Sequence, residues 1–463
     1  MSNRRDFIKS TALAVGAGTI LSGCGSSRTF KSKPVFSMCG YAAPKIPTVR
    51  IGLIGLGNRG PAVIERMALI EGVEIRAICD KYTDRADDAL KRMARLGLAK
   101  PAVYAGTEDI WKELCTRDDL DLIYIVTPWK LHAPMAVFAM EQGKHAAAEV
   151  PAATTLEECR QLVETSERTK KHCVILENCC YDYFEMLTLS MVRQGVFGEV
   201  IHGEGAYIHN LVDFKFSKDG YADMWRLWQN ATHNGNLYPT HGLGPICQCM
   251  NINRGDRMDY LVSMAGSDFT MNTEAKKRAA EDGFYKPFVD QPYRGNMNTT
   301  LIRTIGGKTI MIQHDVSSPR PYSRIHMVSG TKAFAQKWPK THIAFGHEIV
   351  SDDELEKLYE KYSPELIKLL GKTAKQIGGH GGMDFLMDWS LINCLRNGLP
   401  VDMDCYDAAL WSAIRPLSIE SIANRSRPVD VPDFTRGNWR TNKPVSLKVE
   451  SITGVKNIPE KTS

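Results

Sequence analysis

The feature that most limits the fold of this sequence is a glycine-rich turn between an apolar segment and a helix-like segment. Residues 49–54 are mostly apolar, and Gly55, Gly57 and Gly60 follow in the pattern Gly-x-Gly-x-x-Gly. In such a turn the first glycine permits the tight bend. The second lets the backbone approach a pyrophosphate, and the third allows close helix–strand packing. The N-terminus of the following helix adds free N–H groups. The pattern predicts a dinucleotide-binding strand–turn–helix unit.

An acidic residue supports this interpretation and indicates which dinucleotide binds. Asp80 ends the next apolar run, twenty residues after Gly60. A carboxylate at this position accepts hydrogen bonds from ribose hydroxyls and repels a 2′-phosphate. The sequence therefore predicts NAD as the cofactor, in preference to NADP.

The order of strand-like and helix-like segments predicts an α/β protein with two different sheets. The two types alternate from residue 49 to 177, which is typical of a Rossmann domain with a doubly wound parallel sheet. Later strand-like runs follow one another and predict an α+β domain with a large, mostly antiparallel sheet that is open on one face. These runs are 199–210, 260–266, 299–305, 309–316 and 325–330. The predicted divisions are a signal at 1–24, a linker at 25–47, an NAD-binding domain at 48–177, a substrate domain at 178–430 and a tail at 431–463 that wraps the surface or frays.

The first residues are typical of an export signal. Arg4 and Arg5 precede an apolar stretch at 11–21 that is too short to span a bilayer, and Cys24 follows small residues. The paired arginines resemble a twin-arginine signal, and Cys24 is placed for lipid attachment; an ordinary secretory leader is the alternative. We expect an exported periplasmic or cell-surface lipoprotein that contacts the membrane only through Cys24. Ordered structure is expected from about Val49.

Charge and cysteine content exclude some classes of function. The net charge is +5, of which the leader supplies +2, so no nucleic-acid-binding surface is expected. Twelve cysteines occur without a Cys-x-x-Cys pair, and no metal site is predicted. Most of the cysteines are interpreted as small buried residues, although disulfides remain open.

Two later strand ends should also face the cofactor, because ligands bind outside the carboxyl ends of parallel strands. They are Thr127–His132 and Glu149–Pro151. His132 could contact NAD or simply pack at a helix start. With the glycine turn and Asp80, these residues resemble the glucose-fructose oxidoreductase and inositol dehydrogenase superfamily over residues 48–430. Ordinary members carry Glu-Lys-Pro, whereas this chain has Val150 in place of the lysine, which argues against simple dehydrogenase chemistry.

Two segments of the second half narrow the resemblance. Residues 224–228 (Met-Trp-Arg-Leu-Trp) and 236–245 resemble glycoside hydrolase family 109, whose members are NAD-dependent α-N-acetylgalactosaminidases. The resemblance implies that NAD is lined, besides the three glycines, by Asn58, Arg59, Asp80, Trp129, Lys130, Leu131, His132, Glu149, Val150, Asn178 and Tyr238. It implies that the sugar is lined by Tyr207, Arg226, Tyr238, Pro239, Thr240, His241 and Tyr322. The implied partner is a glycan with terminal N-acetylgalactosamine.

An exported enzyme has no soluble nicotinamide pool, so it should return every hydride that it takes. The resemblance implies a cycle in which hydride leaves C3, a base removes the C2 proton and the enolate expels the oxygen on C1. Water then adds to C1, C2 is reprotonated and C3 is reduced again. This cycle does not need the carboxylate pair of ordinary glycosidases.

His241 is the first choice for proton transfer, because imidazole is matched to physiological pH. The alternative is a structural histidine at a glycine-rich turn. Tyr238, three residues earlier, is expected on the same helical face as a second catalytic group. Tyr207 and Tyr238 can donate hydrogen bonds or merely pack. Arg226, between Trp225 and Trp228, could contact a sugar or form a cation–π packing unit. His380, in the glycine run 378–382, is kept off the site because a turn into a helix explains it.

Two other functions remain open. One is an NAD-dependent sugar or cyclitol oxidoreductase, which would accumulate NADH. The other is a non-catalytic sugar-binding lipoprotein that keeps NAD as a structural element. Open sheets in the superfamily also suggest a possible homo-oligomer.

Overall fold

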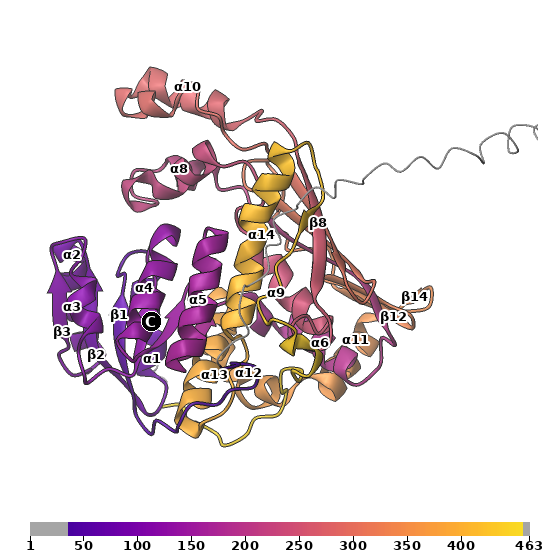
Figure 1. Ribbon diagram of the computed structural model, residues 1–463, viewed down its shortest axis with the longest axis horizontal. Helices are drawn as coiled ribbons and strands as arrows, with labels where there is room; N and C mark the ends of the chain where they lie inside the picture. The colour runs from indigo at the N-terminus through magenta and orange to yellow at the C-terminus, as the bar shows by residue number, and fades with distance from the viewer. Residues whose placement is uncertain (1–35, 457–463) are drawn as a thin grey trace, which may run out of the picture.

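The computed structural model describes residues 36–456, which form two β-sheets with helices packed around them (Figure 1). One sheet has six strands and the other has nine. The predicted fold class, a Rossmann domain followed by a domain with a large, mostly antiparallel sheet, is confirmed. Within residues 36–456, no helix has the length and apolar character needed to cross a bilayer.

The first sheet is parallel, with strand order β3-β2-β1-β4-β5-β6. The order reverses between β1 and β4, which is where a doubly wound sheet opens a crevice for a ligand. All residues of β4 and β5 are buried, as expected for central parallel strands covered by helices. The elements are β1 (Val49–Ile54), α1 (Gly60–Ala68), β2 (Val73–Asp80), α2 (Thr83–Arg95), β3 (Ala102–Ala105), α3 (Trp111–Cys115), β4 (Leu122–Ile125), α4 (Trp129–Glu141), β5 (His145–Ala148), α5 (Leu156–Thr169) and β6 (Cys173–Ile175).

The second sheet has the strand order β14-β13-β12-β11-β7-β10-β9-β8-β15. Among its described strands, only β7 and β10 pair in parallel. The short strands after residue 330 were not predicted, because four-residue runs carry little periodicity. The strands are β7 (Val200–Ile208), β8 (Met258–Ala265), β9 (Asn298–Thr304), β10 (Thr309–Asp315), β11 (Met327–Gly330), β12 (Ala333–Gln336), β13 (His342–Phe345), β14 (Glu348–Ile349) and β15 (Val429–Asp430).

Helix α9 (Thr240–Cys249) covers one face of this sheet and leaves the other face open. On β9 the neighbouring residues Leu301 and Ile302 are 48% and 1% exposed, which is the alternation of a half-covered strand. The α9 backbone lies directly on β7, because a Cβ atom on Gly205 would be 2.3 Å from the Gly242 carbonyl oxygen. Two glycines therefore set the position of the α9 N-terminus.

Helices that follow β6 in the chain return to the Rossmann sheet. The hydroxyl of Ser412 on α14 accepts the N–H groups of Ala152 and Ala153, and Arg66 of α1 pairs with Asp388 of α13 at 2.6 Å. The two sheets are thus held together by buried polar contacts. The helices of this group are α6 (Tyr183–Arg193), α11 (Asp352–Tyr362), α12 (Glu365–Ile377), α13 (Met383–Asn397) and α14 (Cys405–Ala423), with the short 3₁₀ turns η1 (Asn178–Tyr181), η4 (His380–Gly382) and η5 (Asn438–Arg440).

A small helical lobe projects beyond the second sheet, where Figure 1 shows α8 and α10 above the Rossmann helices. Its apolar residues, including Phe216, Leu227 and Phe288, form a core separate from the main one. These helices were not predicted within the strand-rich region. The lobe contains α7 (Val212–Phe216), η2 (Ala222–Met224), α8 (Trp225–Thr232), α10 (Met271–Glu281) and η3 (Gly283–Phe288).

The segments at both ends of the described chain are packed against the body. Met38 is 3% exposed and donates its N–H to the Tyr406 hydroxyl at 3.0 Å, so the prediction that order begins near Val49 is wrong. Apolar residues such as Met38 make this part of the linker a packed segment. At the other end, the Thr453 carbonyl accepts from the Trp389 indole at 2.9 Å. The signal, with Cys24, lies outside the described residues.

The eleven cysteines between residues 36 and 456 are free thiols, and ten of them are buried. The interpretation of most cysteines as small buried residues is therefore confirmed for this part of the chain.

Candidate active site

Two of the three glycines in the turn between β1 and α1 have no room for a side chain. Gly55 has a φ of 99°, and a Cβ atom on it would lie 2.5 Å from the Val126 carbonyl oxygen. A Cβ atom on Gly60 would lie 2.3 Å from the Gly55 carbonyl oxygen, and one on Gly57 would lie 3.2 Å from an Arg85 nitrogen. Because α1 begins at Gly60, its first N–H groups follow the turn directly. The turn therefore fits the pyrophosphate of a dinucleotide.

Asp80 is fixed at the end of β2, beside this turn. Its side chain is buried, with Oδ2 accepting the Leu56 N–H at 2.7 Å and Oδ1 accepting the Tyr82 N–H at 3.0 Å. These bonds hold the carboxylate where the ribose of a dinucleotide is recognised.

The helical lobe touches both sides of the dinucleotide turn. The Asn58 amide donates to the Gly220 carbonyl at 2.5 Å. Asp223 accepts from the Lys81 ammonium at 2.9 Å and from the Tyr82 hydroxyl at 2.8 Å. The segment 220–223 therefore bridges from the lobe to the residues around Gly57 and Asp80.

The start of α4 contributes one aromatic face and one structural histidine. Trp129 is buried and stacks on Tyr238 with ring centroids 5.4 Å apart, whereas Lys130 is exposed and Leu131 is half-buried. His132 is 1% exposed, and its two ring nitrogens lie 2.8 Å and 2.6 Å from the carbonyl oxygens of Pro151 and Thr127. Both nitrogens thus face backbone carbonyl groups, as the packing alternative expects, and contact of His132 with NAD stays a prediction.

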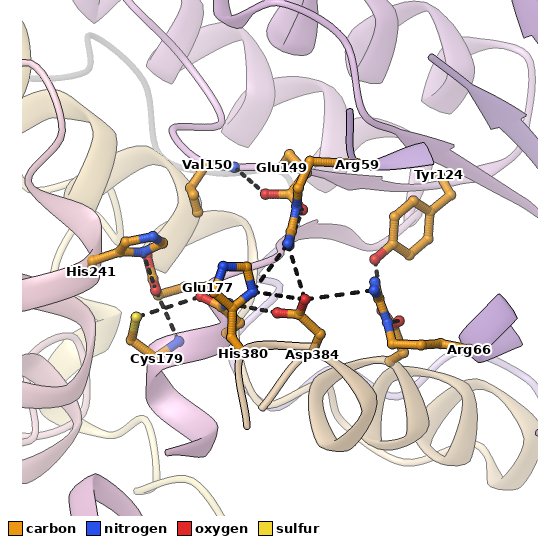
Figure 2. Close-up of polar contacts among 12 residues, drawn as sticks. Arg59, Arg66, Tyr124, Glu149, Val150, Glu177, Cys179, His241, His380 and Asp384 are labelled. Carbon is orange, nitrogen blue, oxygen red and sulfur yellow. Dashed lines mark hydrogen bonds and ion pairs between the residues drawn. The ribbon is translucent and has the colours of Figure 1, made fainter. Parts of the chain in front are cut away.

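Arg59 joins the Rossmann domain to α13 beside the turn (Figure 2). It pairs with Glu149 at 2.7 Å and with Asp384 at 3.0 Å. Burial alone would lower the pKa of Arg59, but the charges of Glu149 and Asp384 raise it above its usual value. Asp384 also accepts from the Asn178 amide at 2.6 Å, so two residues assigned to NAD share one carboxylate. Val150, next to Glu149, is buried and apolar.

His380 was kept off the predicted site, yet the structure places it with this group. Its Nδ1 lies 3.0 Å from Asp384 and 3.2 Å from Arg59. The glycine run does lead into α13, as predicted, but all five residues 378–382 have positive φ, and this turn presents the imidazole to Arg59. Asp384 was also missed. The sequence offered one signal, a histidine inside a run of glycines, and its positive φ is seen only in the structure.

Predicted sugar-binding residues from β7, from the start of α9 and from the segment before β11 meet at one aromatic wall. The Tyr207 ring lies 4.8 Å from Tyr238, 5.4 Å from His241 and 6.4 Å from Tyr322. Burial raises the pKa of Tyr207 and of Tyr238, so both phenols keep their protons and can donate hydrogen bonds.

Arg226 faces this wall with different aromatic partners from those predicted. Its guanidinium lies 4.9 Å from the Trp129 ring and 4.8 Å from the Tyr238 ring, and it donates to the Tyr221 hydroxyl at 2.7 Å. Trp228 is 36% exposed and packs on Phe288 of the lobe instead. Arg226 therefore forms cation–π contacts with Trp129 and Tyr238 and not with Trp225 and Trp228, and its contact with a sugar stays a prediction.

Tyr238 precedes α9 and does not share a helical face with His241, contrary to prediction. Pro239 stands at the helix start and Thr240 is the first helical residue; both are buried. Proline favours this position because the N–H that it lacks would be unpaired there. The Tyr238 and His241 rings nevertheless touch edge to face, with centroids 4.8 Å apart.

His241 has a carboxylate partner that was not predicted. Its Nδ1 lies 2.7 Å from Oε1 of Glu177, which is completely buried after the end of β6. The only sequence signal was its place at the last Rossmann strand end. Although no metal site is predicted, Glu177, Cys179 and His241 offer ligand atoms within 4.8 Å of one another.

Fold and site together define an NAD-binding enzyme in which a Rossmann crevice adjoins an aromatic, histidine-containing wall. The matching family models are "Oxidoreductase family, NAD-binding Rossmann fold" at residues 49–177 and "Glycosyl hydrolase 109, C-terminal domain" at residues 181–441. The chain belongs to glycosyl hydrolase family 109, and it is an NAD-dependent glycoside hydrolase.

Named relatives agree with this assignment. The chain is 50% identical over 413 residues to a glycosyl hydrolase family 109 protein of Porphyromonas gingivalis, with 86% of each chain covered. It is 50% identical over 408 residues to an α-N-acetylgalactosaminidase of Bacteroides fragilis, covering 87% of this chain and 95% of the relative. Among solved structures, a levoglucosan dehydrogenase with NADH and levoglucosan has the same fold, at 18% identity, a TM-score of 0.61 and coverage of 83% and 100%.

Proposed function

We propose that this enzyme hydrolyses terminal α-linked N-acetylgalactosamine from glycans by a redox-neutral cycle. The relative from Bacteroides fragilis that carries the name α-N-acetylgalactosaminidase supports this substrate, since the match covers 95% of its length. The meeting of Tyr207, Tyr238 and His241 beside the dinucleotide crevice supports it as well.

The observation that carries the proposed mechanism is that both glutamates of the site are already engaged. Glu149 is paired with Arg59 and Glu177 with His241, each at 2.7 Å. Ordinary glycosidases need one carboxyl group as an acid and a second as a base or nucleophile. Neither glutamate is free for such a role here, so cleavage is better explained by removal of a proton next to an oxidised ring carbon.

When bound, NAD supplies the acceptor and later the donor of a hydride at the sugar. The chain's own residues supply the rest. His241 takes the proton from C2, exchanges it with solvent and reprotonates C2 after the bond to C1 has broken. Tyr207 and Tyr238, as neutral phenols, donate to sugar oxygens where negative charge develops. Arg226 keeps a positive charge beside these rings.

A glycoside assay tests the proposal. The holoenzyme should release p-nitrophenol from p-nitrophenyl α-N-acetylgalactosaminide without accumulating NADH. In D₂O, the sugar product should carry deuterium at C2. Release without deuterium at C2 would contradict the cycle, and no release by protein that contains NAD would contradict the substrate.

A sugar or cyclitol oxidoreductase is the second candidate. It is favoured by the fold, which is shared with levoglucosan dehydrogenase and with an aldose-aldose oxidoreductase of Caulobacter crescentus at a TM-score of 0.60. Against it stands Val150, a buried apolar residue where the resembling dehydrogenases carry lysine. Stoichiometric growth of the NADH absorbance on a free polyol would select this candidate.

We further propose export with a lipid on Cys24, on the grounds of the paired arginines and the small residues before Cys24. Partition of the cell-derived protein into a detergent phase, lost in Cys24→Ser, tests this.

A second copy of the chain is proposed to pair through the open sheet face, where Met264 and Leu301 are 67% and 48% exposed. Sedimentation of the protein and of Leu301→Glu tests the pairing.

A further inference from the structure

Glu177 is a buried carboxylate to which the sequence assigned no role. It follows β6, and its side chain is completely buried. Oε1 accepts the Cys179 N–H at 3.0 Å, which starts the turn η1. On the other side, a Cβ atom at Gly244 of α9 would lie 3.0 Å from Cγ of Glu177, so α9 has a glycine where this side chain packs. The carboxylate is therefore held between two elements with little freedom.

The same oxygen meets His241. Oε1 of Glu177 lies 2.7 Å from Nδ1 of His241, a length typical of a charge-assisted hydrogen bond. A carboxylate can only accept, so Nδ1 must carry the proton of this bond. The neutral ring then has its lone pair on Nε2, on the side away from Glu177.

We propose that Glu177 is a positioning residue that holds His241 with Nδ1 protonated and leaves Nε2 as the proton acceptor in the sugar site. This inference rests on the proposed function. In the C2 step, the C–H bond breaks, its proton moves to Nε2 and its electron pair stays on the sugar as an enolate. The imidazolium that forms is stabilised by the Glu177 carboxylate. His241, whose proton has exchanged with solvent, reprotonates C2 when water has added to C1.

The surroundings keep Glu177 ionised. Burial alone would raise the pKa of its carboxyl group, but the interactions with His241, including the hydrogen bond, bring it below its usual value. Among the described residues, Cys179, Cys180 and Tyr238 are further titratable groups that interact with Glu177. Burial raises the pKa of all three, so they stay neutral. Glu177 is thus the one charged partner of the imidazole in this group.

A metal ion is the alternative occupant of the group Glu177, Cys179 and His241. The Oε1–Nδ1 distance of 2.7 Å favours the hydrogen bond, because an ion would have to separate these two atoms.

The test compares Glu177→Gln and Glu177→Asp with the wild-type holoenzyme. Glutamine can donate to Nδ1 and so favours the opposite tautomer, whereas aspartate keeps the charge. We expect kcat of Glu177→Gln to fall by about 10²- to 10⁴-fold with KM little changed, since the loss resembles that of a general base in the wrong tautomer. Glu177→Asp should recover part of the rate. NAD content, measured by mass spectrometry, should stay at the wild-type level in both.

A partly buried carboxylate at the other end of η1 provides the control. Asp402 accepts from the Tyr181 hydroxyl at 2.8 Å and has no contact with His241 in the described residues. Asp402→Asn should leave kcat within about twofold of wild type, because turnover does not use this group.

Nitrogen-15 NMR reads the tautomer without any substrate. The His241 signals, assigned by their loss in His241→Gln, should show the Nδ1–H tautomer in wild type and the Nε2–H tautomer in Glu177→Gln. Nε2–H in the wild-type protein would overturn the proposal even if Glu177→Gln does not fold. Unchanged kcat in Glu177→Gln, or one tightly bound zinc per active chain that requires Cys179, would also overturn it. Failure of the glycoside assay with the expected tautomers would instead refute the proposed function.

Discussion

The substitution Gly242→Ala has two opposite effects that can be distinguished: alanine has the higher helix propensity, but it disturbs the close backbone contact that places His241. Propensity alone predicts that alanine stabilises α9 by about 1 kcal/mol. However, a Cβ atom at this position would lie 2.3 Å from the Ala206 nitrogen and 2.7 Å from the Gly205 carbonyl carbon. To reach an ordinary contact of 3.4 Å, α9 and β7 must separate by about 1.1 Å, the difference between 3.4 and 2.3 Å. Both atoms belong to backbone, so no side chain can turn away.

We expect the clash to outweigh propensity, with a net loss of about 1–3 kcal/mol in the free energy of unfolding. Because His241 precedes the substituted residue, a shift of about 1 Å should also lower kcat by roughly 10²-fold. Urea unfolding and the p-nitrophenyl glycoside assay measure the two effects. Gly266→Ala is the control, since a Cβ atom there meets nothing nearer than 3.9 Å. A Gly242→Ala enzyme as stable and as active as wild type would refute the reasoning.

Three further predictions follow from single residues. His241→Ala should lose about 10²- to 10⁴-fold in kcat while keeping NAD, and a wild-type rate would remove its catalytic role. Although burial opposes ionisation, Lys337 and Arg324 lower the pKa of Glu185 to about 2. Its contribution to stability is therefore full above about pH 4.5 and is lost as the pH falls towards 2. Glu185→Gln should be destabilised by about 3–5 kcal/mol at pH 7. Urea unfolding measures the difference in the free energy of unfolding between this variant and wild type, and a difference that does not become smaller between pH 4.5 and 2 would contradict the prediction. Asp223→Asn should lose NAD on dialysis faster than wild type, by no more than about fivefold, since exposed ion pairs contribute up to about 1 kcal/mol. Slower loss than in wild type would contradict the role of residues 220–223 as a bridge to the dinucleotide turn.

The parts of the site that lie next to each other in the sequence could be predicted from it. The glycine turn and Asp80 follow strand ends, and their spacing carries the geometry of a Rossmann unit. Asp384 and His380 could not be found in this way. His380 lies 321 residues from Arg59, and nothing local to either residue indicates the contact.

Local sequence patterns gave wrong predictions of side-chain position where tertiary packing determines that position. The interval from Tyr238 to His241 fits a helical face, but the helix begins only after Pro239. Arg226 has tryptophans on both sides in the sequence, yet its guanidinium contacts Trp129, which comes from the other domain. Side-chain direction depends on where the helix sits, and that position is fixed by the lobe and the sheet.

The parallel pairing of β7 with β10 has a consequence for how this enzyme could change its substrate. Parallel neighbours end at the same edge of a sheet, so Tyr207, near the end of β7, and His314, near the end of β10, arrive side by side, with ring centroids 6.2 Å apart. The connections that leave these two ends can be altered in length or composition without disturbing strand register. Within an unchanged scaffold, new sugar preferences would therefore be sought in residues 209–211 and 316–322.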